Sequence, residues 1–393
     1  MSRLSEMIKE LCPDGVEYKK LGEIAHYAKD RIKISDIDAC NYVGVEHLRQ
    51  NTEGREMSVT LPEVDFVISF YPEDILIGNI RPYLKKAWLA DCHGGTNGDV
   101  LTIRIVDKMY VSPQYLFYIL SSEQFFMYDM KYAKGAKMPR GDKKAVMNYA
   151  IPVPPLAIQN EIVKLLDNFT ELTAELTAEL TAELQLRKKQ YSFYRDSLLN
   201  FSQDNTEVEW KTLGEMCRLK AGTAISALNI STNATADSAV PCYGGNGLRG
   251  YVRQANQSED APLIGRQGAL CGNVCYATAP YYATEHAVVV DGLGHFDNRF
   301  LFHILRNMNL SQYKTAGAQP GLSVNRLNRV RIAAPPMETQ HRIAAILDRF
   351  DALCHDLTQG LPAEIAARKK QYEYYREKLL TFPRKGTSAR RAR

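Results

Sequence analysis

The chain has 393 residues, of which 45% are hydrophobic and 24% are charged, and its formal net charge is +4. These proportions are typical of a globular protein long enough for two or more domains. No apolar run approaches the roughly 20 residues that span a bilayer, and the N-terminal residues lack the apolar core of an export signal. The sequence therefore predicts a cytoplasmic protein with reduced cysteines, whose mild basicity is compatible with nucleic-acid binding but does not by itself indicate it.

A repeated frame surrounds two different blocks of sequence. Residues 1–15 predict a short amphipathic helix that Pro13 and Gly15 end. An opening motif follows at residues 16–23, VEYKKLGE, and it returns at residues 208–215 as VEWKTLGE. A repeated frame around dissimilar blocks suggests one architecture that presents two different surfaces.

The two variable blocks, residues 24–150 and 216–333, are expected to be diverged copies of one α/β domain. Each block contains β-type runs and then a helix with an aromatic face. These elements are expected at residues 74–78, 100–105 and 113–120 in the first block and at residues 261–265, 287–290 and 299–305 in the second.

Basic and amide side chains gather after the strands and in a late glycine-containing loop of each block, at residues 135–141 and 317–321. Lysine and arginine suit phosphate and guanine contacts, and glutamine suits adenine. The alternative for any one of these residues is a solvated basic loop, and the occurrence in both blocks favours function. The candidate DNA-binding residues are Arg81, Lys134, Lys137, Arg140, Lys143, Arg266, Lys314, Gln319 and Arg326.

Two long segments match each other without a gap, residues 154–201 and residues 335–382, at an offset of 181. Both start after a Pro-Pro pair, and their apolar residues recur every three or four positions, which predicts helices of about 45 residues and roughly 65–70 Å. A helix of this length needs a partner for its apolar stripe, and the other copy is the obvious one. The second segment contains Gly360-Leu361-Pro362, which predicts a break into two pieces.

A tetrapeptide, Thr-Ala-Glu-Leu, occurs three times in succession at residues 173–184 of the first long segment. Each unit adds about 6 Å and about 40° to a helix. One interpretation is a plain packing face. The other is a ruler, because adding or removing a unit changes the helix length and keeps the leucine spacing.

Sequence motifs for catalysis are not found. There is no G-x-x-x-x-G-K-[ST] loop, no G-x-G-x-x-G after a strand and no H-E-x-x-H. Cys271 and Cys275 form the one closely spaced cysteine pair, and no further ligands follow at zinc-site spacing. The E-x-K tripeptides of the opening motifs, at residues 17–19 and 209–211, have no companion acidic motif of a nuclease. We therefore expect a binding subunit with neither catalytic nor metal-ligating residues.

The chain resembles the specificity subunit (HsdS) of type I restriction–modification systems. The resemblance rests on the duplicated frame, the V-E-[WY]-K-x-L-G-E motif, the P-P-x-x-x-Q start of each long segment and its R-K-K-Q-Y-x-x-Y-R-[DE]-x-L-L end. The Thr-Ala-Glu-Leu array resembles that of the type IC subgroup. The first copy of the opening motif differs slightly from the pattern, with Lys20 at its variable position. The basic tail after Phe382 has no assigned role. We expect residues 384–393 of this tail to be disordered.

The resemblance implies an α+β protein in which two globular α/β target recognition domains are separated by two long antiparallel helices, a coiled coil, with an internal pseudo-twofold repeat. The expected parts are residues 1–150 with the first recognition domain, residues 151–207 with the central helix, residues 208–333 with the second recognition domain and residues 334–393 with the distal helix and tail.

The same resemblance implies that the chain reads a bipartite, asymmetric double-stranded DNA site and catalyses nothing itself. Its implied partners are two methyltransferase (HsdM) subunits and two restriction and translocation (HsdR) subunits, which would carry S-adenosylmethionine, ATP and Mg²⁺. Two alternatives are a coiled-coil scaffold whose ends bind proteins and a DNA-binding protein outside restriction. Salt-sensitive duplex binding distinguishes the protein scaffold from a DNA reader.

Overall fold

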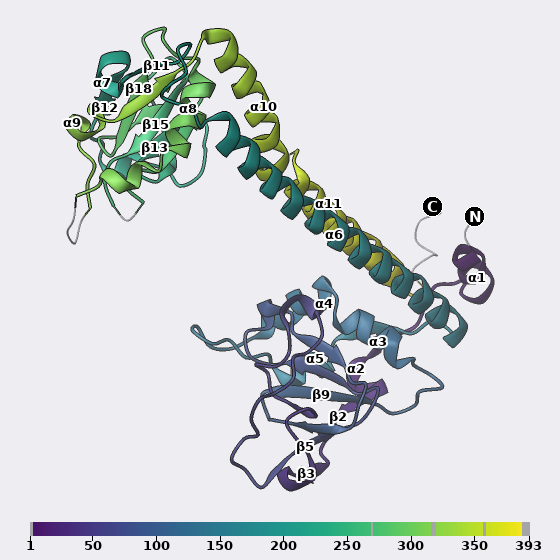
Figure 1. The fold of residues 1–393 in the computed structure, drawn as a ribbon. Coiled ribbons are helices and arrows are strands. Elements are labelled where there is room, and N and C mark those ends of the chain that lie inside the picture. The colour runs from purple at the N-terminus through teal and green to yellow at the C-terminus, as the bar shows by residue number, and fades with distance from the viewer. Residues whose placement is uncertain (1–2, 269, 316–319, 357–358, 387–393) are drawn as a thin grey trace. The chain divides into compact units, whose positions relative to one another are not determined.

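The structure is a computed structural model that describes residues 3–268, 270–315, 320–356 and 359–386. The chain divides into two compact units, whose elements are labelled in Figure 1. Unit 1 comprises Met1–Ala178 together with Ala366–Arg393, and unit 2 comprises Glu179–Ile365. Each unit therefore contains one variable block and parts of both long segments.

Unit 1 begins with helix α1 (Arg3–Leu11), where the amphipathic pattern predicts it. The opening motif then forms strand β1 (Tyr18–Lys20) and the short helix α2 (Leu21–Ile24). Strand β1 pairs antiparallel with β10 (Ala150–Pro152), the last strand of the block. The opening motif thus joins the start of the block to its end.

Two four-stranded sheets form the block of unit 1. The first sheet has the antiparallel order β2 (Ala25–Tyr27), β9 (Val100–Ile105), β6 (Ile75–Gly78) and β7 (Ala87–Leu89). The second has the order β3 (Arg31–Lys33), β5 (Phe66–Phe70), β8 (Gly94–Thr96) and β4 (Tyr42–Val43), with β4 and β8 parallel. Helices α3 (Pro113–Leu120), α4 (Glu123–Tyr132) and α5 (Lys143–Met147) complete the block. Buried Ile75, Leu101 and Tyr115 belong to one core that the first sheet shares with α3.

Unit 2 repeats this plan. Strand β11 (Glu209–Thr212) pairs with β19 (Arg331–Ala334), and α7 (Leu213–Met216) follows β11. The first sheet has the order β12 (Arg218–Ala221), β18 (Ala287–Asp291), β15 (Ala261–Gly265) and β16 (Val274–Ala277). The second has the order β14 (Gly247–Val252), β13 (Val240–Gly244) and β17 (Tyr282–Ala283), with β13 and β17 parallel. Helices α8 (Asn298–Asn307) and α9 (Val324–Leu327) correspond to α3 and α5. The prediction of two diverged copies of one domain is confirmed.

The long segments form the predicted helices. The first is the continuous helix α6 (Leu156–Leu198) of 43 residues. The second is divided into α10 (Met337–His355) and α11 (Leu361–Leu380), as the Gly-Leu-Pro sequence predicts. A Cβ on Gly360 would lie 2.6 Å from the Ala352 carbonyl oxygen, so a side chain does not fit at the break.

Within each unit the two long segments pair, and Figure 1 shows α6 beside α10 and α11. In unit 1 the ring centroids of Phe169 and Tyr375 are 6.2 Å apart. In unit 2 the rings of Phe350 and Tyr194 stack at 5.4 Å. Because Phe350 corresponds to Phe169 and Tyr375 to Tyr194 at the offset of 181, one contact is made twice. Residue numbers rise along α6 from the first contact to the second while they fall along the partner segment. The pairing is therefore antiparallel, as predicted.

The glutamine of each P-P-x-x-x-Q motif is a buried structural residue. The Gln159 amide donates to the carbonyls of Pro154 and Tyr110 at 2.8 and 3.0 Å and accepts from the Ser112 amide at 2.9 Å. Gln340 makes the same three bonds, of 2.9, 3.0 and 2.9 Å, to the backbone of Pro335, His295 and Asp297. Ser112 and Asp297 are the N-caps of α3 and α8. Each glutamine therefore fixes the start of a long helix to the aromatic helix of its own unit.

The first residues of the basic tail are ordered, contrary to the sequence prediction. Val16 donates its amide to the Pro383 carbonyl at 2.9 Å, and Lys385 donates to the Val16 carbonyl at 3.0 Å. The Arg384 guanidinium lies 4.6 Å from the centroid of the Tyr18 ring. Backbone pairing with the opening motif therefore holds this part of the tail, whereas residues 387–393 lie outside the described residues.

Candidate nucleic-acid interface

Three segments meet at one point in unit 1: the residues after β6, the residues after β8 and the late loop. The amide of Asn79 donates to the carbonyl of Asp99 at 2.9 Å, and the amide of Gly141 donates to the carbonyl of Asn79 at 3.1 Å. Lys134 and Arg140 close the late loop by exchanging backbone hydrogen bonds of 2.9 and 2.8 Å. We call this convergence the junction of unit 1.

The junction of unit 2 is built by the same backbone bonds. Arg266 donates to the His286 carbonyl at 2.9 Å, and Leu322 donates to the Arg266 carbonyl at 2.8 Å. Thr315 donates to the Gly321 carbonyl at 2.9 Å, which closes the late loop. Equivalent backbone positions are thereby identified, and they carry different side chains in the two units. Asn79, Asp99, Arg140 and Gly141 of unit 1 are replaced by Arg266, His286, Gly321 and Leu322 in unit 2.

The predicted basic residues of unit 1 lie on or beside its junction. Lys134 is 82% exposed and pairs with Asp142 at 2.7 Å, and Arg140 pairs with Asp99 at 3.1 Å. Lys137 is exposed, and Lys143 is the exposed first residue of α5. Solvent-exposed ion pairs contribute little to stability, so these cations can exchange a carboxylate for a phosphate at small cost.

Asp142 holds the late loop against α5. Its carboxylate is the N-cap of α5 and accepts from the amides of Lys144 and Ala145 at 2.9 and 3.1 Å. The hydrogen bond from Lys134 and these two amide bonds lower the pKa of Asp142 to about 2. The carboxylate therefore stays ionised and keeps the start of α5 in place beside the exposed lysines.

The sequence-based pairing of Arg81 with Arg266 is wrong by two residues. Arg266 follows β15 directly and is equivalent to Asn79, whereas Arg81 lies in a tight turn with a φ of 52°. The Arg81 Nε is buried and has no hydrogen-bond partner among the described residues. Strand boundaries, which no local pattern marks to the residue, decide this register.

The basic positions of unit 2 likewise do not correspond one to one with those of unit 1. The exposed Lys314 precedes Thr315, which is the equivalent of Lys134. Arg326 lies in α9 and donates to the Tyr313 carbonyl at 3.2 Å, so it is tied to the segment that precedes the late loop. Gln319 lies outside the described residues.

A buried carboxyl lies under the late loop of unit 1. Asp129 is fully buried, and neither carboxyl oxygen has a hydrogen-bond partner among the described residues. A Cβ on Gly141 would lie 2.4 Å from Asp129 Oδ1, so the glycine makes room for the carboxyl. Burial, and secondarily the charge of Asp142, raises the pKa of Asp129 to about 6. The corresponding pair in unit 2 is Leu310 and Leu322, both buried.

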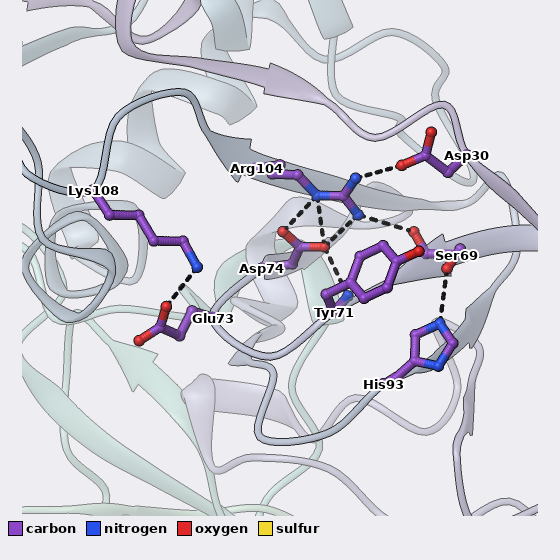
Figure 2. Close-up of polar contacts among 8 residues, drawn as sticks. All are labelled: Asp30, Ser69, Tyr71, Glu73, Asp74, His93, Arg104 and Lys108. Carbon is purple, nitrogen blue, oxygen red and sulfur yellow. Dashed lines mark hydrogen bonds and ion pairs between the residues drawn. The ribbon is translucent and has the colours of Figure 1, made fainter.

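A separate polar network in unit 1 is structural (Figure 2). Arg104 of β9 donates to the buried Asp74 at 2.8 Å and to Asp30 at 2.5 Å, and its guanidinium lies 4.7 Å from the centroid of the Tyr71 ring. It also reaches the carbonyl of Ser69 in β5 at 3.4 Å, which links the two sheets. Asp74 comes just before β6, whereas the junction lies just after β6. The Arg104 network is therefore at the opposite end of this strand from the junction.

Metal and membrane sites are not indicated by the described part of the chain. It holds no group of three or more histidine, cysteine, aspartate or glutamate residues that could bind a metal. Burial raises the pKa of the Cys275 thiol to about 11, which disfavours the thiolate that zinc requires. None of the helices in these residues has the length and apolar content of a membrane span.

The family model for the type I restriction modification DNA specificity domain matches the chain twice, at residues 13–186 and 205–367. The chain belongs to this family. Each match contains one opening motif, one junction and the first part of the long helical segment that follows it, so the family model follows the repeat in the sequence.

Curated relatives of this specificity subunit include the EcoprrI specificity subunit of Escherichia coli, 52% identical over 53% of this chain and 52% of the other. The chain therefore matches about half the length of that relative. A putative type I specificity subunit of Haemophilus influenzae is 31% identical over 93% of this chain and 96% of its own. A solved chain of a type I restriction–modification system has a TM-score of 0.67 at 19% identity, covering 94% of this chain and 98% of the other, and it shows the same fold.

Several residues of this specificity subunit that the structure brings to the junctions escaped the sequence analysis. Asn79, Asp99 and His286 are neither basic clusters nor parts of a motif, and their backbone bonds join segments far apart in sequence. A weak signal was available, because Asn79 and Arg266 each come directly after a predicted β-type run that ends in glycine. Polar residues at the ends of strands are often functional, since loops carry function on a rigid scaffold.

Proposed function

We propose that this specificity subunit recognises a bipartite, asymmetric double-stranded DNA site, with the junction of unit 1 reading one half and the junction of unit 2 reading the other. The observation that carries the proposal is one backbone scaffold, built twice by equivalent hydrogen bonds, that presents different side chains. Base identity is read by side chains at base edges, while lysine and arginine hold phosphates. Two non-identical readers in one chain require two non-identical half-sites.

The chain also acts as a scaffold for the catalytic subunits, and it catalyses nothing itself. Phe193 and Tyr374 support this part of the proposal, because they are equivalent at the offset of 181 and are 68% and 61% exposed. Each follows the R-K-K-Q-Y sequence of its segment. A repeated, exposed aromatic residue beside a basic run suits two copies of one partner, and we assign it to two methyltransferase subunits.

The methyltransferase subunits would carry S-adenosylmethionine, and two restriction and translocation subunits with ATP and Mg²⁺ would complete the nuclease, all in the cytoplasm. None of this chemistry is assigned to residues of the specificity subunit. Its contribution is to position the methyltransferase subunits on the DNA whose bases the junctions select.

We propose further that the Thr-Ala-Glu-Leu array sets the gap between the half-sites. Leu180 and Leu184 of the array are buried, so its leucines face the core of the helix pair. The division between the two units falls after Ala178, inside the array. A change in the number of repeats therefore changes the stretch of helix that joins one reader to the other.

The test is to express the chain with its methyltransferase partner in a host free of other methylation and to map the methylated sites. We expect two short half-sites separated by a fixed unread gap, and no methyl transfer by the specificity subunit alone. Modification without a bipartite site would contradict the proposal. A purified chain that shows no salt-dependent duplex binding would favour the protein-binding scaffold instead.

A further inference from the structure

Unit 2 has a cleft at its junction that the function described so far leaves unassigned. Its volume is about 650 Å³. The β13–β14 turn forms one wall with Asn246 and Arg249, and Gln267, His286 and Gly321 form the other. The cleft therefore opens at the point where the three segments of the junction converge.

Glycines line part of this cleft, and the backbone packs closely around one of them, Gly245. A Cβ on Gly265 would lie 1.9 Å from the Gly245 carbonyl oxygen, and a Cβ on Gly245 would lie 2.8 Å from the Gln267 carbonyl oxygen. β4 pairs in parallel with β8 in unit 1 as β13 pairs with β17 in unit 2, and this shared register makes Val45 the equivalent of Gly245. The Val45 side chain comes within 3.1 Å of a Cβ placed on Gly78. The Gly245 backbone therefore lies directly against Gly265, at the place where a valine side chain approaches Gly78 in unit 1.

The walls of the cleft carry hydrogen-bonding groups that lack partners among the described residues. The Arg249 side chain runs over Gly244, with its Cδ 3.6 Å from where a Cβ would be. No hydrogen bond or ion pair within the described residues satisfies its guanidinium. His286 Nδ1, and Arg266 Nε just behind the cleft, are buried without a partner in the same residues. Gln267 is exposed and adds an amide that can both donate and accept.

These groups match the major-groove edge of a purine. Guanine presents two acceptors, O6 and N7, to which an arginine binds in a bidentate manner, and glutamine does the same with adenine N6 and N7. A phosphate would also accept from Arg249, but a phosphate contact carries no sequence information. The Gln267 amide on the opposite wall adds a group that reads base edges, and this favours a base over a phosphate.

We propose that this cleft is the base-reading site of unit 2, in which Arg249 selects a guanine of one half-site and Gln267 selects a neighbouring adenine. This inference rests on the proposed function, because it assigns the bases that one of the two junctions reads.

The experiment maps methylated sites, and measures duplex binding, for the chain with its methyltransferase partner as wild type, Arg249→Ala, Gln267→Ala and the control Arg253→Ala. Arg253 is exposed and lies just beyond β14, outside the cleft. We expect Arg249→Ala to lose about ten- to one-hundred-fold of its preference for guanine at one position. Gln267→Ala should relax an adjacent position of the same half-site. The gap, the other half-site and the control should stay unchanged.

Three outcomes would overturn the base-reading site. They are an unchanged half-site in both cleft variants, changes in different half-sites, and an even loss of affinity on all sequences with a shallower salt dependence, which indicates a phosphate contact. Thermal unfolding of each variant verifies that the fold is intact. A wild-type complex that reads no bipartite site would instead contradict the proposed function, so the two failures are distinguishable.

Discussion

Removing one Thr-Ala-Glu-Leu unit should move the two half-sites closer together. Deleting residues 181–184 shortens α6 by about 6 Å and rotates its continuation by about 40°. Duplex DNA rises about 3.4 Å per base pair, so the change corresponds to one or two base pairs. Leu176 and Leu180 remain at their four-residue spacing, and the junctions are untouched. Both half-site sequences should therefore persist while the unread gap contracts.

The partner helix determines how much of this change reaches the DNA. α10 ends at His355 and α11 begins at Leu361, so the partner segment is divided and can absorb part of the change when α6 alone is shortened. The segment equivalent to 181–184 at the offset of 181 is residues 362–365, at the start of α11. We expect the single deletion to shift the gap by one base pair, and the double deletion of 181–184 with 362–365 to shift it by two.

The assay is methylated-site mapping of the wild type, both single deletions and the double deletion, each with the methyltransferase partner. Circular dichroism and thermal unfolding confirm that each variant is folded. An active deletion variant with the wild-type gap would refute the ruler and leave the repeats as a packing face alone. Altered half-site bases would show that the array and the junctions are not independent.

Four further outcomes are expected. Gln340→Ala removes three side-chain hydrogen bonds to the backbone, of which the one to Pro335 is buried. It should lower the free energy of unfolding by roughly 2–5 kcal/mol in chemical denaturation, and a change under about 1 kcal/mol would contradict its structural role. The pKa of Asp129 is raised to about 6 from an ordinary value near 3.8, so the folded state holds its proton more tightly than the unfolded state, and stability falls as pH rises between these values. The Asp129→Asn variant should not show this fall, so its free energy of unfolding should rise relative to that of the wild type by up to about 3 kcal/mol between pH 4 and pH 7. If the unfolding free energies of the two proteins depend on pH in the same way, this prediction is wrong. Lys134→Ala should weaken binding evenly on all sequences and reduce the salt slope by about 1, and a base-specific effect would reassign this lysine. Replacing Phe193 and Tyr374 together by Ala should abolish binding of the methyltransferase subunits in co-purification. Each single variant should lose one of the two methyltransferase copies. A double variant that still binds two copies would exclude this surface.

Local sequence patterns determined the helical frame of this protein. The 3.6-residue periodicity, the Pro-Pro starts and the break at Gly360 depend on neighbours within one or two turns, so α6, α10 and α11 could be predicted. The same holds for α3, which begins at Pro113 after its serine N-cap. The offset of 181 also revealed that the two blocks share one plan, because a repeat is visible without any knowledge of the fold.

The tertiary structure alone decided which residues form the junctions. Asn79, Asp99 and Gly141 come together through backbone bonds between segments tens of residues apart, and side-chain type gives no sign of such pairing. The register error between Arg81 and Arg266 has the same origin, since it depends on where each strand ends. Gly245, in the turn after β13, lies against Gly265 at the end of β15, which belongs to the other sheet, and no local pattern marks this contact. Periodicity reports which face of an element is buried, but only the packed fold determines what that face meets.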